Sequence, residues 1–339
     1  MSSLTSTLKP LLERRSLSTE QMRDAFRAMM AGEVGHGEIG ALLALLATRV
    51  PTSAELLGAA QVMRENVSRL QTRTDPEDIV DTCGTGGAPK TFNVSTLAGI
   101  VAAASGAHVA KHGNRSRTGR GSAELLEALG VNLEAPLEVQ ARCLDEVGIT
   151  FCFAVRHHPA MKHVAPVRQS LGFPTIFNLL GPLTNPAGAR RQVLGVYEPR
   201  FLEPVAQTLS ELGTRKSLVV HSDDGLDELS ISAGTELMQV TPDGITRLRV
   251  VPEELGLERA PREAVMAEDL AHAVRIARAI LAGEERGAPR DAVVLASAAA
   301  LFVADRVSSL EQGVRTALEA LESGRAQATL DAWISASRG

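Results

Sequence analysis

Two glycine-rich segments of this chain carry residue types that are suited to binding a phosphate group. Residues 83–87 read Cys-Gly-Thr-Gly-Gly and residues 111–115 read Lys-His-Gly-Asn-Arg, and each segment ends a short apolar stretch. Glycines let backbone N–H groups approach an anion, and a helix that follows presents unsatisfied N–H groups and a positive dipole end. In the second segment Lys111 and Arg115 add full positive charges. The pattern predicts a phosphate site.

The spacing of the glycines does not support two common classes of phosphate-binding loop. It matches neither the G-x-G-x-x-G pattern of dinucleotide-binding proteins nor the G-x-x-x-x-G-K-[ST] pattern of P-loop proteins. A glycine turn between a strand and a helix is also common in proteins that bind nothing there. The residues of this loop alone leave both interpretations open.

Asp227 and Glu228 form a carboxylate pair just beyond the apolar segment 217–221. Adjacent carboxylates are often only solvated surface. They also suit magnesium, which prefers hard oxygen ligands and keeps waters while it bridges substrate phosphates.

Composition restricts the class of protein. A chain of 339 residues with 44% hydrophobic residues can bury a large core, and this length suggests one large domain with a smaller one. A net charge of −5 and only 3% aromatic residues argue against binding to nucleic acid or to anionic membranes. The three cysteines fit neither a disulfide framework nor a zinc site. No secretory signal or membrane span is predicted, so we expect a soluble, cytoplasmic protein.

The elements that position these residues follow from the apolar patterning. The first seventy or so residues read as helices, with capping boxes predicted at Ser18 with Gln21 and at Thr52 with Glu55, and an apolar helix at residues 39–48. From Asp78 onward strands alternate with helices, which predicts a mixed, mainly parallel sheet with both faces covered. The strand candidates are residues 79–82, 108–111, 149–153, 192–196 and 218–221. A hairpin of residues 236–240 and 245–250 closes one edge, and the rest is helical.

Taken with further motifs, the two loops resemble the anthranilate phosphoribosyltransferase family of tryptophan biosynthesis over nearly the whole chain. The motifs that carry the resemblance are residues 81–87 (DTCGTGG), 91–96 (TFNVST), 111–116 (KHGNRS), 158–164 (HPAMKHV), 166–168 (PVR), 177–186 (FNLLGPLTNP) and 224–228 (DGLDE).

The resemblance implies an α/β fold with a small all-helical domain and a large α/β domain. The small domain would comprise residues 1–72 joined by an inserted segment near 165–186, and the large domain residues 73–164 and 187–339. The active site would lie in the cleft between them, and the protein would be a homodimer through the helical domain. The implied activity transfers the phosphoribosyl group of phosphoribosyl pyrophosphate to the amine of anthranilate and releases pyrophosphate.

Such a transfer depends on positioning and electrostatics, so we assign no catalytic nucleophile or base. The resemblance implies two Mg²⁺ ions held by Ser95, Asp227 and Glu228, and an anthranilate site at Gly84, His112, Asn114 and Arg168, where the Arg168 fork would hold the carboxylate. Asn93 could alternatively cap a helix. The residues assigned to phosphoribosyl pyrophosphate are Gly84, Gly87, Thr91, Asn93, Val94, Ser95, Thr96, Lys111, His112, Gly113, Asn114, Arg115, Ser116, Arg117, Thr118, Gly119 and Ser122.

Two loops depart from the family pattern, and each is one residue shorter than usual. Ala-Pro-Lys at residues 88–90 follows the first glycines, where the family usually supplies an acidic contact. Residues 116–122 (Ser-Arg-Thr-Gly-Arg-Gly-Ser) replace a serine-rich stretch. We expect Arg117 and Arg120 to supply anion contacts in place of the lost hydroxyls. Ser222, where glycine is frequent, is a mild change.

Two other functions are compatible with parts of the pattern. A pyrimidine nucleoside phosphorylase-like enzyme would share the architecture and cleave a nucleoside with free phosphate. A catalytically inactive relative would bind nucleic acid through a basic groove. Asn114 with Arg115, the Asp227–Glu228 pair and Arg168 favour the transferase, and the net negative charge argues against nucleic acid.

Overall fold

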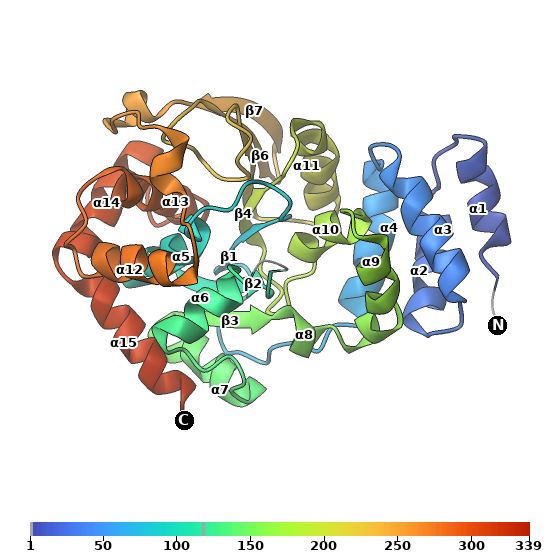
Figure 1. Ribbon diagram of the computed structural model, residues 1–339, viewed down its shortest axis with the longest axis horizontal. Coiled ribbons are helices and arrows are strands. Elements are labelled where there is room, and N and C mark those ends of the chain that lie inside the picture. The colour runs from blue at the N-terminus through green and yellow to red at the C-terminus, as the bar shows by residue number, and fades with distance from the viewer. Residues whose placement is uncertain (1–2, 117–118) are drawn as a thin grey trace.

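The N-terminal part of the molecule is helical. A computed structural model describes residues 3–116 and 119–339 (Figure 1). The first helices are α1 (Thr5–Leu12), α2 (Thr19–Met30), α3 (His36–Ala47) and α4 (Ser53–Glu65). The hydroxyls of Ser18 and Thr52 accept the N–H groups of Gln21 and Glu55 at 3.2 and 3.3 Å, and both side chains reach back at 2.9 Å. Both predicted capping boxes are therefore confirmed.

A single mixed sheet forms the centre of the rest of the chain. Its strands are β1 (Ile79–Gly84), β2 (His108–Gly113), β3 (Ile149–Phe153), β4 (Arg191–Gly195), β5 (Lys216–Ser222), β6 (Thr235–Thr241) and β7 (Gly244–Val250). Their order is β3-β2-β1-β4-β5-β6-β7. The first five strands run parallel, and the β6–β7 hairpin closes the edge antiparallel. The predicted strands, the hairpin and the mainly parallel sheet are confirmed.

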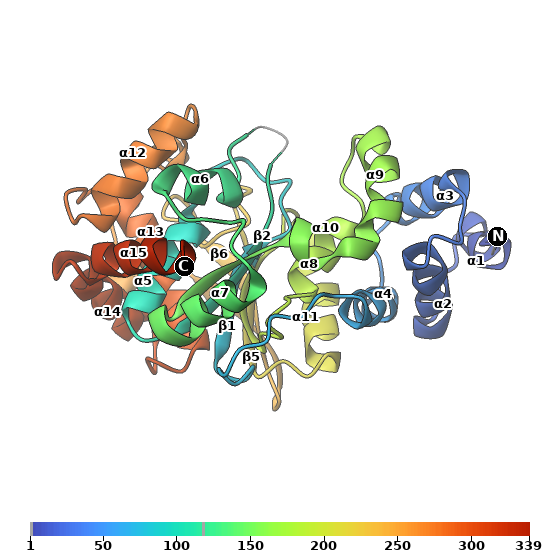
Figure 2. The same ribbon diagram turned by 90° about the horizontal axis from the view of Figure 1, so that it is seen from below.

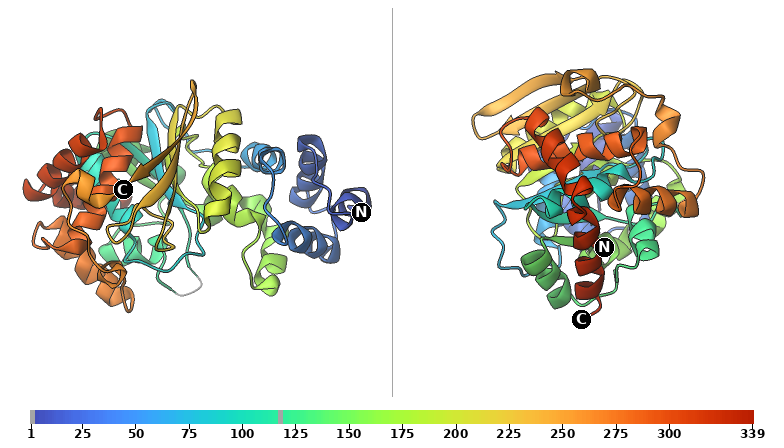
Figure 3. Two further views of the ribbon diagram at one scale, coloured as in Figure 1. Left: turned by 90° about the horizontal axis from the view of Figure 1, so that it is seen from above. Right: turned by 90° about the vertical axis from the view of Figure 1, so that its left-hand side faces the viewer.

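Helices cover both faces of the sheet (Figure 3). One face packs on α5 (Val94–Ala104), α6 (Ser122–Leu129), α12 (Leu270–Leu281), α13 (Ala288–Val303), α14 (Leu310–Glu322) and α15 (Arg325–Ser337). The other packs on α11 (Leu202–Glu211) and α4. Successive residues of β5 alternate between the two cores, with Leu218 and Val220 in the first and Val219 in the second.

The segment between β3 and β4 leaves the sheet and packs against the N-terminal helices. It contains α8 (Ala154–His157), α9 (Ala165–Leu171) and α10 (Ile176–Leu180), with α9 beside α3 and α10 beside α4 (Figures 1 and 2). Between α6 and β3 the chain forms α7 (Leu137–Arg142) and a short π-helix, Cys143–Val147. Within the part of the chain that the structure describes, every helix is too short or too polar to cross a bilayer.

Candidate functional site

The loops at the carboxyl ends of β1, β2, β4 and β5 meet at one edge of the sheet. The chain runs outward from β1 through β2 to β3 and then returns to place β4 on the other side of β1. Parallel sheets bind ligands at such a switch point, outside the carboxyl ends of the strands. The predicted glycine loops and the acidic turn all lie at this edge.

The first glycine loop, residues 84–93, is held by contacts from three directions. The Thr85 N–H donates to the Gly195 carbonyl at 2.9 Å, and the Thr85 hydroxyl accepts the Tyr197 N–H at 3.0 Å. The Asn178 amide from α10 donates to the Thr85 carbonyl at 3.1 Å. Gly86 and Gly87 take φ values of +64° and +101°, a region where a side chain is strained. The loop is thus anchored while its glycines expose backbone.

Helix α5 begins directly after this loop, and its cap residue contributes no side-chain bond to the first turn. Asn93 occupies the cap position with φ 68°, and its side chain makes no capping bond. Its amide instead donates to the Arg120 carbonyl at 3.4 Å. Asn93 thus occupies the predicted cap position without a side-chain capping bond, and its left-handed backbone turns the amide toward the second loop. The Thr96 hydroxyl, in the same turn, is buried without a partner among the described residues.

The acidic pair lies against the glycine loop. A Cβ atom on Gly84 would lie 2.8 Å from Asp227 Oδ2, and one on Gly195 would overlap the Asp227 carbonyl oxygen. The Ser95 N–H, in the first turn of α5, donates to Glu228 Oε1 at 3.2 Å. Two glycines therefore create the room that brings the carboxylates to the start of α5.

Burial and mutual repulsion disturb the titration of this pair. Burial, and next the charge of Asp227, raise the pKa of Glu228 to about 7, although bonds from Ser95 and Thr91 oppose the shift. Burial raises the pKa of Asp227, against the attraction of the Lys90 cation. Two carboxylates held close together and partly out of water favour a bound cation.

Lys111 supplies the positive charge of the site from inside β2. Its side chain is 4% exposed, and its ammonium group donates to the Thr82 carbonyl and to the Ser95 hydroxyl, the latter at 3.3 Å. Burial lowers the pKa of Lys111, and the charges of Asp81, Glu228 and Asp227 oppose that shift. The cation thus lies beside the first turn of α5.

The donor set fits magnesium. Among the described residues no three His, Cys, Asp or Glu side chains gather as a metal site, so the protein offers two carboxylates and the Ser95 hydroxyl. Mg²⁺ usually takes one or two carboxylates and fills its remaining positions with waters and substrate phosphate oxygens. Two carboxylates and one hydroxyl beside a phosphate loop leave coordination positions open for such waters and phosphate oxygens.

The second loop, which follows β2, is held by its own polar groups and by the carboxylates of Glu124 and Glu127 on α6. Arg115 makes a bidentate ion pair with Glu127 at 2.6 Å, so its charge is already neutralised. Ser116 and Gly119 bond to each other through the backbone, and Asn114 accepts the N–H of Arg115. A Cβ on Gly113 would lie 2.5 Å from the Ser122 hydroxyl, so the loop returns to its own start. Arg117 and Thr118 lie outside the described residues.

Arg120 bonds to backbone carbonyls of a distant segment, and its expected role as an anion contact stays a prediction. Its Nη1 donates to the carbonyls of Ala267 and Glu268, at 3.0 Å for the latter. The side chain therefore ties the second loop to a segment after the hairpin. The sequence alone could not indicate this contact, because its two acceptors lie 147 and 148 residues later in the chain.

The predicted anthranilate residues His112 and Arg168 come from β2 and α9. His112 lies at the end of β2, where its Nδ1 is 3.0 Å from the Gly181 carbonyl and its Nε2 is 3.2 Å from Nε2 of His158. Burial lowers the pKa of His112 to about 3 and that of His158 to about 4, so both rings are neutral. Arg168, on α9, places its guanidinium 5.0 Å from the ring centre of Phe177.

A buried polar link between β1 and β2 was missed by the sequence reasoning. Asp81 is fully buried, and it accepts the His112 N–H at 3.0 Å and the Asn185 amide at 2.8 Å. The same amide donates to the Ala110 carbonyl at 2.7 Å. The signal was present in the sequence, because a carboxylate in the middle of an apolar strand needs a partner.

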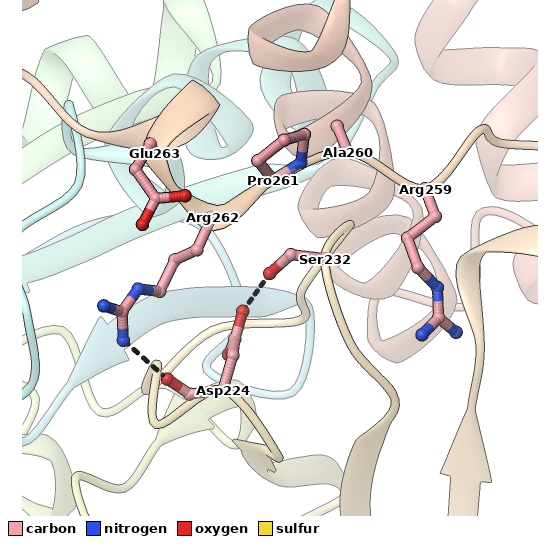
Figure 4. A pocket seen from close by; sticks show the side chains of 7 residues that line it. All are labelled: Asp224, Ser232, Arg259, Ala260, Pro261, Arg262 and Glu263. Atoms are coloured by element: carbon pink, nitrogen blue, oxygen red, sulfur yellow. Dashed lines mark hydrogen bonds between the residues drawn. The ribbon is translucent and has the colours of Figure 1, made fainter.

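A cavity beside this site contains none of the predicted substrate residues in its lining. It has a volume of about 600 Å³, and its lining is Asp224, Ser232, Arg259, Ala260, Pro261, Arg262 and Glu263 (Figure 4). Its arginines are engaged, Arg259 with Glu253 and Arg262 with the Asp224 carbonyl. The glycine loops and acidic turn are thus better candidates for the substrate site than this cavity.

Comparisons with known proteins agree over the whole chain. The sequence profile of the glycosyl transferase family, a/b domain, matches residues 76–327, and that of the helical bundle domain matches residues 5–67. The anthranilate phosphoribosyltransferase of Symbiobacterium thermophilum is 47% identical over 96% of this chain and 95% of its own length. That of Rubrobacter xylanophilus is 46% identical over 95% and 94%. The crystal structure of the enzyme from Thermus thermophilus is 45% identical, with a TM-score of 0.91 over 98% of this chain and 99% of that one.

Proposed function

Because the chain belongs to the anthranilate phosphoribosyltransferases of the glycosyl transferase family, we propose that its sheet edge is the site where anthranilate attacks phosphoribosyl pyrophosphate. The reaction transfers the phosphoribosyl group to the anthranilate amine, releases pyrophosphate and belongs to tryptophan biosynthesis. The comparisons do not favour a nucleoside phosphorylase or an inactive nucleic-acid-binding protein.

The pyrophosphate is bound by the first glycine loop and the start of α5. The cap residue Asn93 makes no side-chain capping bond there, although the Ser95 N–H donates to Glu228, and the helix dipole favours an anion. A phosphate oxygen would satisfy the orphan hydroxyl of Thr96. Lys111 holds its ammonium group beside the Ser95 hydroxyl and balances charge that develops on the leaving pyrophosphate.

Asp227, Glu228 and Ser95 would hold magnesium, of which we propose two ions. When bound, the metal neutralises the pyrophosphate and makes it a better leaving group. The acidic pair itself repels a phosphate anion, so without a cation these carboxylates oppose substrate binding. The pKa of Glu228 is raised first by burial and next by the charge of Asp227.

Anthranilate is positioned by the second loop and α9. We propose that Arg168 holds its carboxylate, and that Asn114 and Gly84 contribute polar contacts beside it. His112 is fixed as a neutral ring by the Gly181 carbonyl, which accepts the proton on Nδ1. Its Nε2 then accepts from His158, so the pair orients without carrying charge.

One observation supports the metal and phosphate assignment most strongly. The Asp227–Glu228 pair contacts both Gly84 and the N–H of Ser95, and Ser95 lies 133 residues before Glu228 in the sequence.

The test is anthranilate consumption, followed by loss of its fluorescence, with phosphoribosyl pyrophosphate and magnesium. Asp227→Asn combined with Glu228→Gln should abolish magnesium-dependent turnover while the fold is kept. Asp223→Asn, in the same turn but paired with Arg249 at the surface, is the matched control. Full activity of the folded double variant would overturn the metal assignment.

The assembly is also a proposal. We propose a homodimer through the helical domain, formed by residues 1–72 with the inserted segment 165–186, while residues 73–164 and 187–339 form the large domain. The packing of α9 on α3 and of α10 on α4 supports this division. A reducing, cytoplasmic location is supported by the three cysteines, which are buried and unpaired.

A further inference from the structure

A short segment after the hairpin contacts both glycine-rich loops. We refer to residues 262–268, which begin as the 3-10 helix Arg262–Val265, as the strap. Met266 forms an isolated antiparallel bridge with Thr91, and the Phe92 N–H donates to the Val265 carbonyl at 3.1 Å. Arg120 of the second loop donates to the strap carbonyls of Ala267 and Glu268. The strap thus spans the two loops assigned to phosphoribosyl pyrophosphate.

The strap also reaches the acidic turn. Arg262 Nη1 donates to the Asp224 carbonyl at 3.0 Å, across the cavity described above (Figure 4). The Asp224 carboxylate in turn organises its own loop, because it accepts hydroxyls from Ser222, Ser230 and Ser232 and the Leu226 N–H. A rigid turn held at one carbonyl by Arg262 therefore carries Asp227 and Glu228.

We propose that the strap sets the distance between the acidic turn and the phosphate loops, and that Arg262 and Arg120 are positioning residues for the magnesium–pyrophosphate end of the substrate. The inference rests on the proposed function. Asp227 and Glu228 repel each other and the pyrophosphate, and the bonds that hold them to the glycine loop and the start of α5 come from Gly86, Thr91 and the Ser95 N–H, the last at 3.2 Å. This repulsion favours a wider separation between the acidic turn and the phosphate loops. The strap opposes that separation without touching the substrate.

Arg259 provides a matched control for Arg262. It lies three residues earlier, lines the same cavity and carries the same charge, but its guanidinium pairs with Glu253 at 2.6 Å. Arg262→Ala should raise the KM for phosphoribosyl pyrophosphate and the half-saturating magnesium concentration about tenfold each, the usual effect of losing a charged hydrogen bond. The KM for anthranilate should change less than about twofold, and Arg259→Ala should match the parent enzyme.

Binding measurements separate this inference from the proposed function. Calorimetry with phosphoribosyl pyrophosphate and magnesium should show the same tenfold weakening in Arg262→Ala and recovery in Arg262→Lys, which keeps a cationic donor. Hydrogen exchange should be faster at the amides of Leu226 and Ser95 in Arg262→Ala and unchanged in Arg259→Ala. Arg120→Ala combined with Arg262→Ala should weaken binding less than the product of the single effects, because both release one tether.

The outcomes are distinct. If the parent protein binds no phosphoribosyl pyrophosphate, both the proposed function and the strap are overturned. If the parent binds and turns over, but Arg262→Ala equals Arg259→Ala in binding and exchange, only the strap is overturned. The strap proposal is also overturned if Arg262→Ala raises the KM values of both substrates equally and leaves hydrogen exchange unchanged, because a general loss of stability then explains the effect.

Discussion

The raised pKa of Glu228 should make magnesium affinity and folding stability change with pH in opposite directions. Its folded pKa of about 7 lies above the ordinary value of 4.5, mainly through burial and then through Asp227. A raised carboxyl pKa contributes stability that is fully present below pH 4.5 and is lost as pH rises through 7. Magnesium, by contrast, must displace the proton below pH 7. The metal-free protein should therefore be more stable at pH 6 than at pH 8 on account of this group, while its magnesium affinity falls.

Two titrations check this prediction. The half-saturating magnesium concentration should rise by up to about tenfold for each pH unit below 7. Denaturant unfolding without metal should show the opposite trend, and Glu228→Gln should remove that part of the stability change. Asp223→Asn, which alters an exposed carboxylate of the same turn, should retain both trends. A magnesium requirement that is flat between pH 6 and 8 contradicts the assignment of Glu228.

Arg168 is the residue on which the anthranilate assignment depends. Its guanidinium stacks on Phe177, which fixes the orientation of the fork. Arg168→Ala should raise the KM for anthranilate about ten- to hundredfold, because losing a charged contact to a carboxylate costs roughly 1.5–3 kcal/mol. The KM for phosphoribosyl pyrophosphate should change far less. Arg168→Lys, which keeps the charge but not the fork, should fall between. The control is Lys162→Ala, which removes an exposed cation from the preceding 3-10 helix Pro159–His163. If Arg168→Ala raises the KM values of both substrates equally, Arg168 does not contact the anthranilate carboxylate.

At the scale of elements, the close approach of the acidic turn to β1 depends on Gly84. A methyl group there would lie 2.8 Å from Asp227 Oδ2, and the backbone of Asp227 cannot retreat because its carbonyl lies against Gly195. Gly84→Ala must therefore rotate the carboxylate out of place. We expect the half-saturating magnesium concentration to rise at least about tenfold, with a stability loss of about 1–3 kcal/mol from overpacking. Gly181→Ala makes the same change at a site with no atom within 4 Å, so magnesium titrations of the two variants should differ. Equal behaviour would show that the turn adapts freely.

The elements themselves could be predicted because their signals are local. Ser18, Thr52 and the turn at residues 241–244 carry capping and turn chemistry in adjacent residues, and all three features are present. The parallel strands follow from apolar runs alternating with helices. What was missed depends on contacts between distant segments: Arg120 turns to carbonyls 147 and 148 residues later, and Asp81 pairs with Asn185. No local pattern encodes such partners, and the left-handed backbone of Asn93 likewise follows from its surroundings.

At the scale of the whole molecule, the sheet separates two hydrophobic cores, and the proposed site is built from elements that pack in both. Cys83, Leu194 and Val219 face the core that includes the N-terminal helices, whereas Val80, Val109 and Leu218 face the C-terminal helices. The N-terminal core also contains Phe177 and Leu180 of α10, the helix whose Asn178 holds the glycine loop. Asn178 thus links the N-terminal core to the Thr85 carbonyl. The proposed contacts to anthranilate and to pyrophosphate thus come from elements of different packing units, which are joined across β1.

An interface between two copies through the helical domain would cover the most exposed large apolar side chain of the described residues. Leu12, at the end of α1, is 69% exposed, and Val155, in α8, is 66% exposed. Burying a leucine contributes about 1.5–3 kcal/mol, and a two-fold interface counts it twice. Leu12→Asp should therefore raise the dimer dissociation constant at least about a hundredfold in sedimentation equilibrium. Val155→Asp introduces the same charge at a similarly exposed apolar position and should leave the dimer intact. A monomeric parent protein would overturn the homodimer, and dissociation by Val155→Asp alone would move the interface from the helical domain to the face that carries α8.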